Sequence, residues 1–361
     1  MTKKTGPARP NLSAVAARAG VSTATASKVV NGRPDVAEDT RERVETAITA
    51  LGYRGPSRTT TAHTVELMVD TLDTTYASQI LRGVVLAAEE QGLEVVVGRV
   101  RRRSANGVPE SSAAWAQRLA AADRVGAIVL TSGLGPDVYA SLARARVPLV
   151  VIDPLDVTEE GVVSVGSTNW LGGRSAAEHL VRLGHRHLAV VAGPAESLSA
   201  VARLDGFLTY CRQQGVEIDP DLVRPIRFDH DQAVQVAERW FQRPDPPTAV
   251  FAGSDAQAMG VLEAARRARL RVPEDVSLVA YDDTPLASWA NPPLTAVRQP
   301  LEEIGRRALL TVQQLHEGRP VDSHHIEIAT TFVVRDSTAV PRTELPRTEL
   351  PRTELPRDAR G

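Results

Sequence analysis

From residue 64 onward the chain alternates short apolar segments with longer amphipathic ones. The first apolar segments are VELMV, EVVVGRV, GAIVLT and PLVVID, and segments with helical periodicity lie between them at 78–91, 111–123 and 136–146. Two parallel strands need a long crossover between them, which is usually a helix. Strands that alternate with helices of about ten to fifteen residues therefore predict an α/β fold with parallel sheets.

The alternation continues in a second series, which predicts a second sheet. Its apolar segments are VVSVG, HLAVVAG, TAVFAG and DVSLVAYDD, and its helical segments lie at 172–183, 203–214, 231–242 and 256–267. We expect a first lobe at about 65–163 and 293–324 and a second lobe at about 164–292 and 325–338. On this division LTAVRQP and a helix at 301–316 return to the first lobe, and TFVVRDS returns to the second. Repeated crossing between lobes builds a hinged cleft.

The N-terminal segment differs from this body in charge. Residues 1–60 contain ten Lys or Arg and five Asp or Glu, whereas the remaining residues contain 32 and 39. A chain of 361 residues is long enough for two or three domains. A small basic domain on an acidic body indicates that only the small domain meets a polyanion.

Within the basic segment, VAARAGVSTATASKVVNG predicts two short helices joined by a tight turn. Asn11 can cap a first helix that ends at Ala19, and Gly20 supplies the left-handed conformation of the turn. Ser22 caps the second helix, and a third amphipathic helix at about 38–51 closes the core. This arrangement is a helix-turn-helix. The spacing alone also allows a generic three-helix bundle with a polar face.

The second helix places small and hydroxyl-bearing side chains, with one long cation, along its exposed side and margins. The candidate DNA-contacting residues are Ser22, Thr23, Ala24, Thr25, Ser27, Lys28 and Asn31. Short hydroxyls and amides suit phosphate oxygens, and a long cation can reach guanine edges in the major groove. Short side chains also let the helix sit deep in that groove.

The segment LSAVAARAGVSTATASKVVNGRPDVAEDTRERVETAITALGYR resembles the DNA-binding head of lac-repressor (LacI/GalR-type) regulators. The body resembles the effector-binding core of that family in ILRGV, NWLGGRSAAEHLVRLGHRHLAVVAG, ARLDGF, VVRDST and the long segment from AVFAGSDAQAMG to VRQP. The resemblance covers nearly residues 11–338. It implies a small all-α helix-turn-helix head and an α/β two-lobed core like a periplasmic binding protein, with parallel sheets and a hinged cleft.

The resemblance also implies a function. The protein would be a sequence-specific transcriptional regulator that binds a pseudo-palindromic double-stranded operator as a homodimer or a tetramer. It would repress carbohydrate-utilisation genes until a sugar or oligosaccharide effector in the cleft releases it. The alternative is a sugar-binding receptor without DNA function, which the head and the missing export signal disfavour.

The head departs from the family pattern at three positions. Ala26 and Lys28 stand where the family usually has Val and Arg, and Lys cannot make the two-pronged contact of Arg with guanine. We therefore expect an altered sequence preference. Ala37 replaces the usual Ser cap of the third helix, where Glu38 and Asp39 can compensate through the helix dipole.

The resemblance further implies a set of effector-binding residues. They are Asp73, Tyr76 and Gln79 after the first strand, Asn169 at the lobe boundary, and Arg203, Phe228 and Asp255 in the second lobe. Trp289 is a further candidate on its chemistry alone. An aromatic ring beside charged donors and acceptors suits a sugar, which has an apolar face and many hydroxyls. We expect Arg203 and Asp255 to share one wall of the cleft.

No other class of function competes in the sequence. The chain has no P-loop, GxGxxG, HExxH or GxSxG motif, and Cys211 is its one cysteine, so we expect no enzyme, no metal site and no cofactor. It contains no run of 18 apolar residues, and its N-terminus, MTKKTGPARP, lacks the apolar segment of a signal peptide. We therefore expect a cytoplasmic protein without a membrane partner.

The predicted boundaries are a disordered N-terminus at 1–10, the head at 11–57, a linker at 58–64, the core at 65–338 and a disordered tail at 339–361. The linker region RGPSRTTTAHT contains no Leu, whereas the family usually has a hinge helix there with a Leu that wedges into the minor groove. We expect operator DNA to bend little. The tail contains RTELP three times, a repeat that has no apolar face and for which we expect no function.

Overall fold

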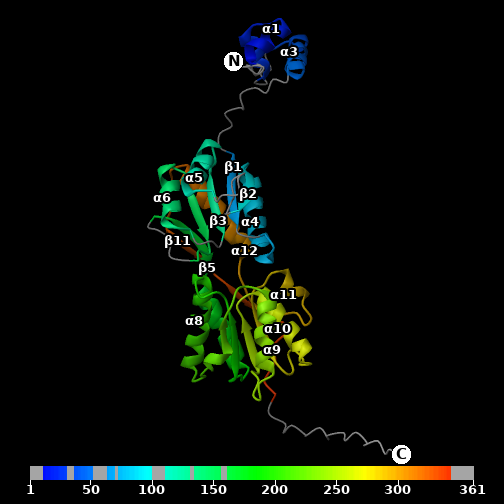
Figure 1. Ribbon diagram of the computed structural model, residues 1–361, viewed down its shortest axis with the longest axis vertical. Helices are drawn as coiled ribbons and strands as arrows, with labels where there is room; N and C mark the ends of the chain where they lie inside the picture. The colour runs from blue at the N-terminus through cyan, green and yellow to red at the C-terminus, as the bar shows by residue number, and fades with distance from the viewer. Residues whose placement is uncertain are drawn as a thin grey trace, which may run out of the picture. The chain divides into compact units, whose positions relative to one another are not determined.

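The computed structural model describes residues 11–30, 36–51, 63–69, 72–99, 110–130, 134–155 and 161–342. The chain divides into two compact units, Met1–Ala62 and His63–Gly361, which we call the head and the core (Figure 1). The predicted N-terminal segment, Asn31, most of the linker and nearly all of the RTELP repeats lie outside the described residues.

The head consists of three helices, α1 (Leu12–Ala19), α2 (Thr23–Val30) and α3 (Glu38–Leu51), which confirms the predicted helix-turn-helix. The Asn11 side chain accepts a hydrogen bond from the backbone N–H of Ala14 and caps α1. Gly20 ends α1 with φ 66°, a left-handed conformation that glycine adopts without strain. The helices pack around a small core of Val15, Ala16, Ala19, Ala26, Val29, Val44 and Ala47.

Lobe 1 of the core is a six-stranded parallel sheet with helices on both faces. The strand order is β11-β5-β4-β3-β1-β2. The strands are β1 (Thr64–Val69), β2 (Glu94–Arg99), β3 (Gly126–Leu130), β4 (Leu149–Ile152), β5 (Val163–Ser167) and β11 (His325–Ile328). The helices are α4 (Thr75–Gln91), α5 (Ser112–Ala121), α6 (Pro136–Arg144) and α12 (Leu301–His316). Helices α4 and α12 pack on each other, as do α5 and α6.

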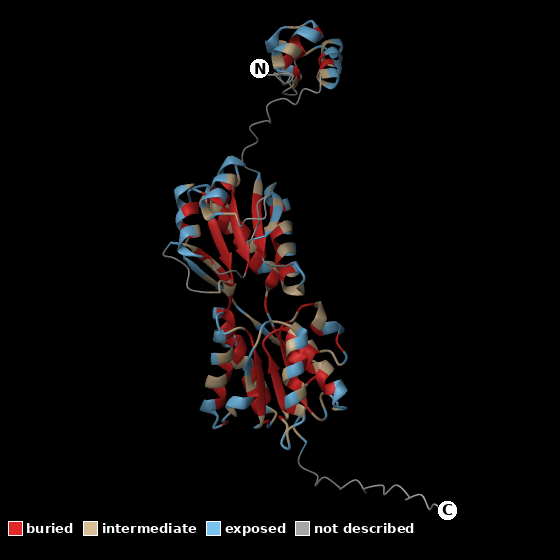
Figure 2. Ribbon diagram, viewed as in Figure 1, coloured by how far each residue is buried: buried red, intermediate tan, exposed pale blue. Residues whose placement is uncertain are grey.

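Lobe 2 is a second six-stranded sheet, in the order β12-β10-β9-β8-β6-β7. The strands are β6 (Leu188–Ala192), β7 (Val223–Pro225), β8 (Ala249–Ala252), β9 (Ser277–Asp282), β10 (Thr295–Arg298) and β12 (Thr331–Val333), with β12 antiparallel to β10. Helices α7 (Asn169–Arg182) and α8 (Leu198–Gln213) pack on each other, and so do α9 (His230–Phe241) and α10 (Asp255–Arg267). The 3₁₀ turn η1 (Pro220–Leu222) and helix α11 (Pro285–Trp289) complete the lobe. Figure 2 shows the central strands as the buried layer of each lobe, whereas the edge strands β2, β7, β11 and β12 are half-buried or exposed.

Three strands lie in a different lobe from the one predicted. The sequence-based boundary assigns most of β5 and all of β11 to the second lobe and β10 to the first. The structure reverses all three, since β5 pairs with β4, β11 pairs with β5, and β10 pairs with β9. The chain therefore enters lobe 2 only after β5, and it returns to lobe 1 at α12 rather than at LTAVRQP. An apolar run predicts a strand, but it does not show which sheet the strand joins.

Candidate ligand-binding cleft and nucleic-acid interface

Helix α2 presents one face to solvent and one to the core of the head. Ala26 and Val29 are buried, whereas Ser22, Thr23, Ala24 and Lys28 are exposed. The candidate DNA-contacting residues Thr25 and Ser27 are half-buried at its margins, and the structure does not describe Asn31. Ser22 accepts a hydrogen bond from the backbone N–H of Thr25 and caps the helix.

Because Ala26 faces the core of the head, its departure from the family pattern changes packing rather than the exposed face. Lys28 is the departure that alters the exposed face. The change in sequence preference that we expect therefore rests on Lys28 alone.

A cavity of about 520 Å³ lies between the two lobes. Lobe 1 contributes the segment after β4 together with β5 and β11, and lobe 2 contributes the starts of α7 and α8. Its polar lining residues are Asp153, Ser164, Ser167, Asn169, Ser199, His325 and Glu327. Hydroxyl and amide groups donate and accept hydrogen bonds, and carboxylates accept them, so this lining suits a ligand with many hydroxyls.

Arg203 is fixed beside this cavity at the start of α8. It is 4% exposed, its Nε donates to Asn169 Oδ1 at 2.8 Å, and its Nη1 donates to the carbonyl oxygen of Gly253 at 2.7 Å. The same Nη1 lies 3.6 Å from Asp282 Oδ1, and the guanidinium stacks 3.9 Å from the centre of the Tyr281 ring. These contacts hold a cation at the lobe boundary in a single orientation.

Two glycines allow α7 and α8 to approach closely enough for the Arg203–Asn169 contact. A Cβ atom at Gly173 would overlap the carbonyl oxygen of Arg203, and one at Gly206 would overlap the carbonyl oxygen of Trp170. The backbones of the two helices therefore touch at this crossing. The glycines position the two polar side chains, although they make no contact with a ligand themselves.

Asp153 was not predicted, yet it is a buried carboxylate that lobe 1 brings to the cavity. It follows β4, is buried, and accepts a hydrogen bond from the Tyr76 hydroxyl. Burial raises the pKa of Asp153 above its ordinary value, against the lowering effects of the Tyr76 hydrogen bond and the Arg203 charge. Gly166 leaves room for the carboxylate, because a Cβ there would lie 2.7 Å from Asp153 Oδ1.

A second group that was not predicted connects the lobes. Ser167 of lobe 1 donates to Gln299 Oε1 at 2.6 Å, and Gln299 donates to Asp282 Oδ1 of lobe 2 at 2.6 Å. Burial raises the pKa of Asp282 to about 6, against the lowering effects of Arg203 and Gln299. Asp153 and Asp282 share a signal that could have revealed them: each is an acidic residue at the carboxyl end of a buried parallel strand, where α/β folds bind ligands.

Asp255 lies in the same cluster of charges but does not line the cavity. It begins α10, is 1% exposed, and its Oδ2 accepts a hydrogen bond from the backbone N–H of Thr284 at 2.6 Å. Its Oδ1 is buried without a hydrogen-bond partner among the described residues. Burial, reinforced by the Asp282 carboxylate, raises the pKa of Asp255 well above its ordinary value.

The other predicted effector residues differ in where the structure places them. Phe228 lies beside the cluster, with its ring centre 5.7 Å from the Arg203 guanidinium carbon. Gln79 is half-buried on α4, one turn after Tyr76, and Asp73 is exposed. Trp289 is 79% exposed at the end of α11, and no described contact connects it with the cluster.

The described residues contain no group of three or more His, Cys, Asp or Glu side chains arranged to hold a metal ion. Within the same ranges, no helix combines the length and the apolar character that a bilayer crossing requires.

Comparisons with known proteins match both units. The family profile of bacterial regulatory proteins of the lacI family matches residues 11–55, and that of the periplasmic binding protein-like domain matches residues 177–338. The HTH-type transcriptional regulator CelR of Thermobifida fusca is 34% identical over 341 residues, which are 91% of this chain and 98% of that protein. The HTH-type transcriptional repressor CytR of Escherichia coli strain K12 is 29% identical over 330 residues, and the match covers 90% of this chain and 95% of that protein.

Solved structures give the same result for the fold. A lac repressor dimer bound to operator and the anti-inducer ONPF has a TM-score of 0.74 at 29% identity, with 92% of this chain and 100% of that chain covered. A transcriptional regulator CelR–cellobiose complex has a TM-score of 0.68 at 35% identity, with 91% of this chain and 100% of that chain covered. These relatives are transcriptional regulators and not enzymes.

Proposed function

The chain belongs to the lacI family of bacterial regulatory proteins, and we propose that it is a repressor that a sugar or oligosaccharide releases from operator DNA. The observation that carries the proposal is the guanidinium of Arg203, held between Asn169 and Asp282 beside a cavity lined by hydroxyl groups. A fixed two-pronged donor next to buried carboxylates can satisfy several ligand hydroxyls at once. A relative of this chain has been solved as a complex with cellobiose, which supports this ligand class.

Effector binding acts on both lobes. Asp153 and Ser167 come from lobe 1, while Asn169 and Arg203 come from lobe 2. A ligand that bridges them binds the closed arrangement of the lobes better than the open one. That difference in affinity sets how far the ligand can shift the equilibrium between the open and the closed arrangement of the lobes. Movement of lobe 1 then changes the spacing of the two heads in a dimer.

The head supplies operator recognition through the exposed face of α2. One helix-turn-helix reads only a few base pairs, so a homodimer on a pseudo-palindromic operator doubles the site. The relative in the lac repressor structure is a dimer bound to operator, which supports this assembly. A regulator of this kind acts where the bacterial chromosome lies, in the cytoplasm.

The experiment that tests the proposal measures sugar binding and operator binding in one preparation. Melting temperatures of the full-length protein are recorded with a panel of mono- and disaccharides that includes cellobiose, because a ligand of the folded state raises the melting point. Sugars that bind are then added to the protein on its operator in a gel-shift assay. We expect a sugar that raises the melting point also to release the DNA.

Arg203→Lys should keep operator binding and lose sugar binding, because Lys lacks the planar fork. Arg212→Lys, a change at an exposed position of the same helix, should leave both unchanged. A protein that binds the sugar but no operator would be the sugar receptor without DNA function. A sugar that strengthens operator binding would show a corepressor and contradict release.

A further inference from the structure

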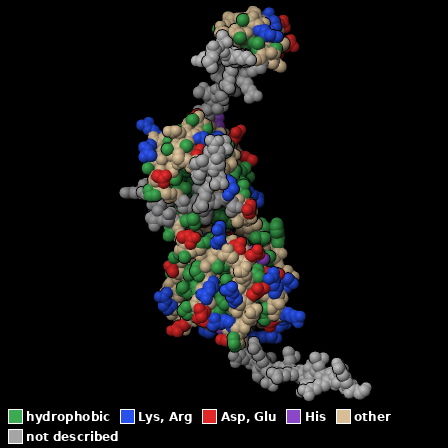
Figure 3. Space-filling model, in the orientation of Figure 1, with side chains coloured by type: hydrophobic (Ala, Val, Ile, Leu, Met, Phe, Trp, Pro, Cys, Tyr) green, Lys and Arg blue, Asp and Glu red, His purple; other side chains and the backbone are tan. Residues whose placement is uncertain are grey.

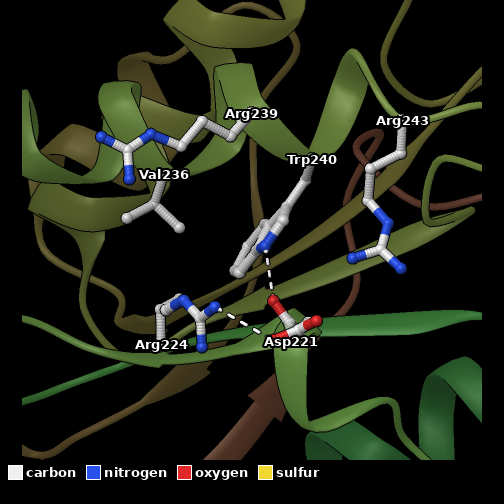
Figure 4. A pocket seen from close by; sticks show the side chains of 6 residues that line it. All are labelled: Asp221, Arg224, Val236, Arg239, Trp240 and Arg243. Atoms are coloured by element: carbon white, nitrogen blue, oxygen red, sulfur yellow. Dashed lines mark hydrogen bonds and ion pairs between the residues drawn. The ribbon is translucent and has the colours of Figure 1, made fainter.

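A second hollow lies in lobe 2 and shares no residue with the cleft. Its volume is about 240 Å³. It is lined by Asp221, Arg224, Val236, Arg239, Trp240 and Arg243 (Figure 4). Three of these six side chains are guanidinium groups, and two of the others supply apolar surface.

The hollow is built on one face of α9 and on the segment opposite it. Val236, Arg239 and Trp240 lie three or four residues apart and share one face of α9, whereas Arg243 follows the helix, which ends at Phe241. Trp240 is 3% exposed, and its indole Nε1 donates to the carbonyl oxygen of Asp221 at 3.0 Å (Figure 4). This bond ties α9 to η1. The floor of the hollow is therefore fixed before any ligand arrives.

The three arginine side chains differ in how many hydrogen bonds they make. Arg243 donates to Asp219 Oδ2 at 2.7 Å, and Arg224 donates to Asp221 Oδ1 at 3.3 Å. Arg224 also donates to two backbone carbonyl oxygens, at 3.3 and 3.5 Å. Arg239 is exposed and makes no hydrogen bond or ion pair with a described residue, and Figure 4 draws none for it.

The hollow therefore carries an excess of positive charge. Two carboxylates, Asp219 and Asp221, face three guanidinium groups. On the face drawn in Figure 3, Lys and Arg are intermixed with Asp and Glu over this lobe. An uncompensated guanidinium above an apolar floor is suited to a ligand that is anionic at one end and carbon-rich at the other.

We propose that this hollow binds the phosphate group of a small phosphate monoester, separately from the ligand of the cleft. Arg239 receives the phosphate oxygens, because its planar guanidinium fork matches phosphate geometry. Trp240 and Val236 lie under the carbon part. The Asp221 carboxylate remains paired with Arg224 and weakens binding by like-charge repulsion.

The test follows Trp240 in the full-length protein. Labelling with 5-fluorotryptophan gives one fluorine resonance for each of the four tryptophans. The Trp240 resonance is assigned by its loss in Trp240→Phe, or by elimination with the other three replacements if that variant does not fold. We expect glycerol 3-phosphate to shift this resonance in a saturable manner and glycerol to leave it unchanged.

Three variants identify the side chains that bind the phosphate group. Arg239→Gln should weaken binding about tenfold, because it removes a charge-assisted contact. Asp221→Asn should strengthen it, because it removes the opposing charge. Arg212→Gln is the matched control, since Arg212 is also an exposed arginine in the last turn of a helix in lobe 2 and its side chain makes no hydrogen bond or ion pair with a described residue.

The proposal is wrong if glycerol 3-phosphate leaves the Trp240 resonance unmoved, or if Arg239→Gln and Arg212→Gln bind it equally well. Equal shifts from glycerol 3-phosphate and from chloride at the same ionic strength would also overturn it, because they would show unspecific ion binding. A response to an acidic peptide alone would indicate a protein contact surface instead.

Discussion

Asp153, Asp255 and Asp282 are three buried carboxyl groups at the lobe boundary. Asp153 and Asp282 interact with the buried guanidinium of Arg203, and Asp255 interacts with the Asp282 carboxylate. Burial is the main reason why the pKa of each carboxyl group is raised. One positive charge does not offset the desolvation of three negative ones. The cluster therefore takes up protons more readily in the folded state than in the unfolded state.

Asp282 makes the stability of the protein depend on pH. Its pKa is 3.8 ordinarily and about 6 in the folded state, so the folded protein gains a proton between these values that the unfolded chain does not. The free energy of unfolding of the wild type, relative to Asp282→Asn, should rise as the pH falls from 7 to 4. The expected gain is on the order of 2 kcal/mol. Urea unfolding of both proteins across this range measures it, and a pH-independent difference would contradict the raised pKa.

At the scale of elements, the crossing of α7 and α8 determines whether the site can form. Gly173 and Gly206 bring the two helix backbones into contact, and that contact places Asn169 within 2.8 Å of Arg203. Lobe 1 uses the same device, since Cβ atoms at Gly83 and Gly305 would overlap the backbones of α12 and α4. In both lobes, the close approach of two helices depends on residues without a Cβ.

Gly206→Ala should therefore destabilise the protein and weaken effector binding. Helix propensity alone would favour Ala by about 1 kcal/mol. The added methyl group would overlap the backbone of α7, and overpacking of this kind costs roughly 1–3 kcal/mol. Thermal unfolding and sugar calorimetry measure the two effects, with Ser175→Ala at a half-buried position of α7 as the control. A variant as stable as the wild type would show that the helices separate freely.

The sequence predicted the elements better than their partners. Helix α12 at 301–316 and the three helices of the head agree with their predicted ranges, because caps and apolar spacing are local signals. The sheet that β5, β10 and β11 join depends on long-range pairing, which the apolar pattern does not encode. The predicted lobe boundaries failed at these three strands for that reason.

The candidate site was predicted in part. Asn169, Arg203 and Asp255 lie in one cluster, and Tyr76 joins it through Asp153. Asp282 and Gln299 are absent from the predicted set, because their role arises from hydrogen bonds between segments far apart in the chain. Trp289 was proposed on its chemistry alone, and nothing in its sequence context gave its position on an exposed helix end.

For the whole molecule, the question is whether a mutation can remove effector binding and leave operator binding intact. Asp255 is suited to this test because its Oδ1 is buried and has no partner among the described residues, while Oδ2 accepts from Thr284. Asp255 does not line the cavity, so we propose that a ligand hydroxyl reaches this open acceptor only when the ligand draws the two lobes together. Asn at this position keeps the size and one acceptor oxygen, so the bond to Thr284 can persist.

We expect Asp255→Asn to weaken sugar binding at least about tenfold, because a ligand hydroxyl loses one of the two acceptor oxygens. Operator affinity without sugar should stay at the wild-type value, since the head is a separate compact unit. In cells the variant would repress and could not be induced. Calorimetry with the sugar, and operator binding with and without it, measure the two properties in one preparation. Joint loss of both would assign Asp255 to the folding of the core, and retention of both would place the effector away from this cluster.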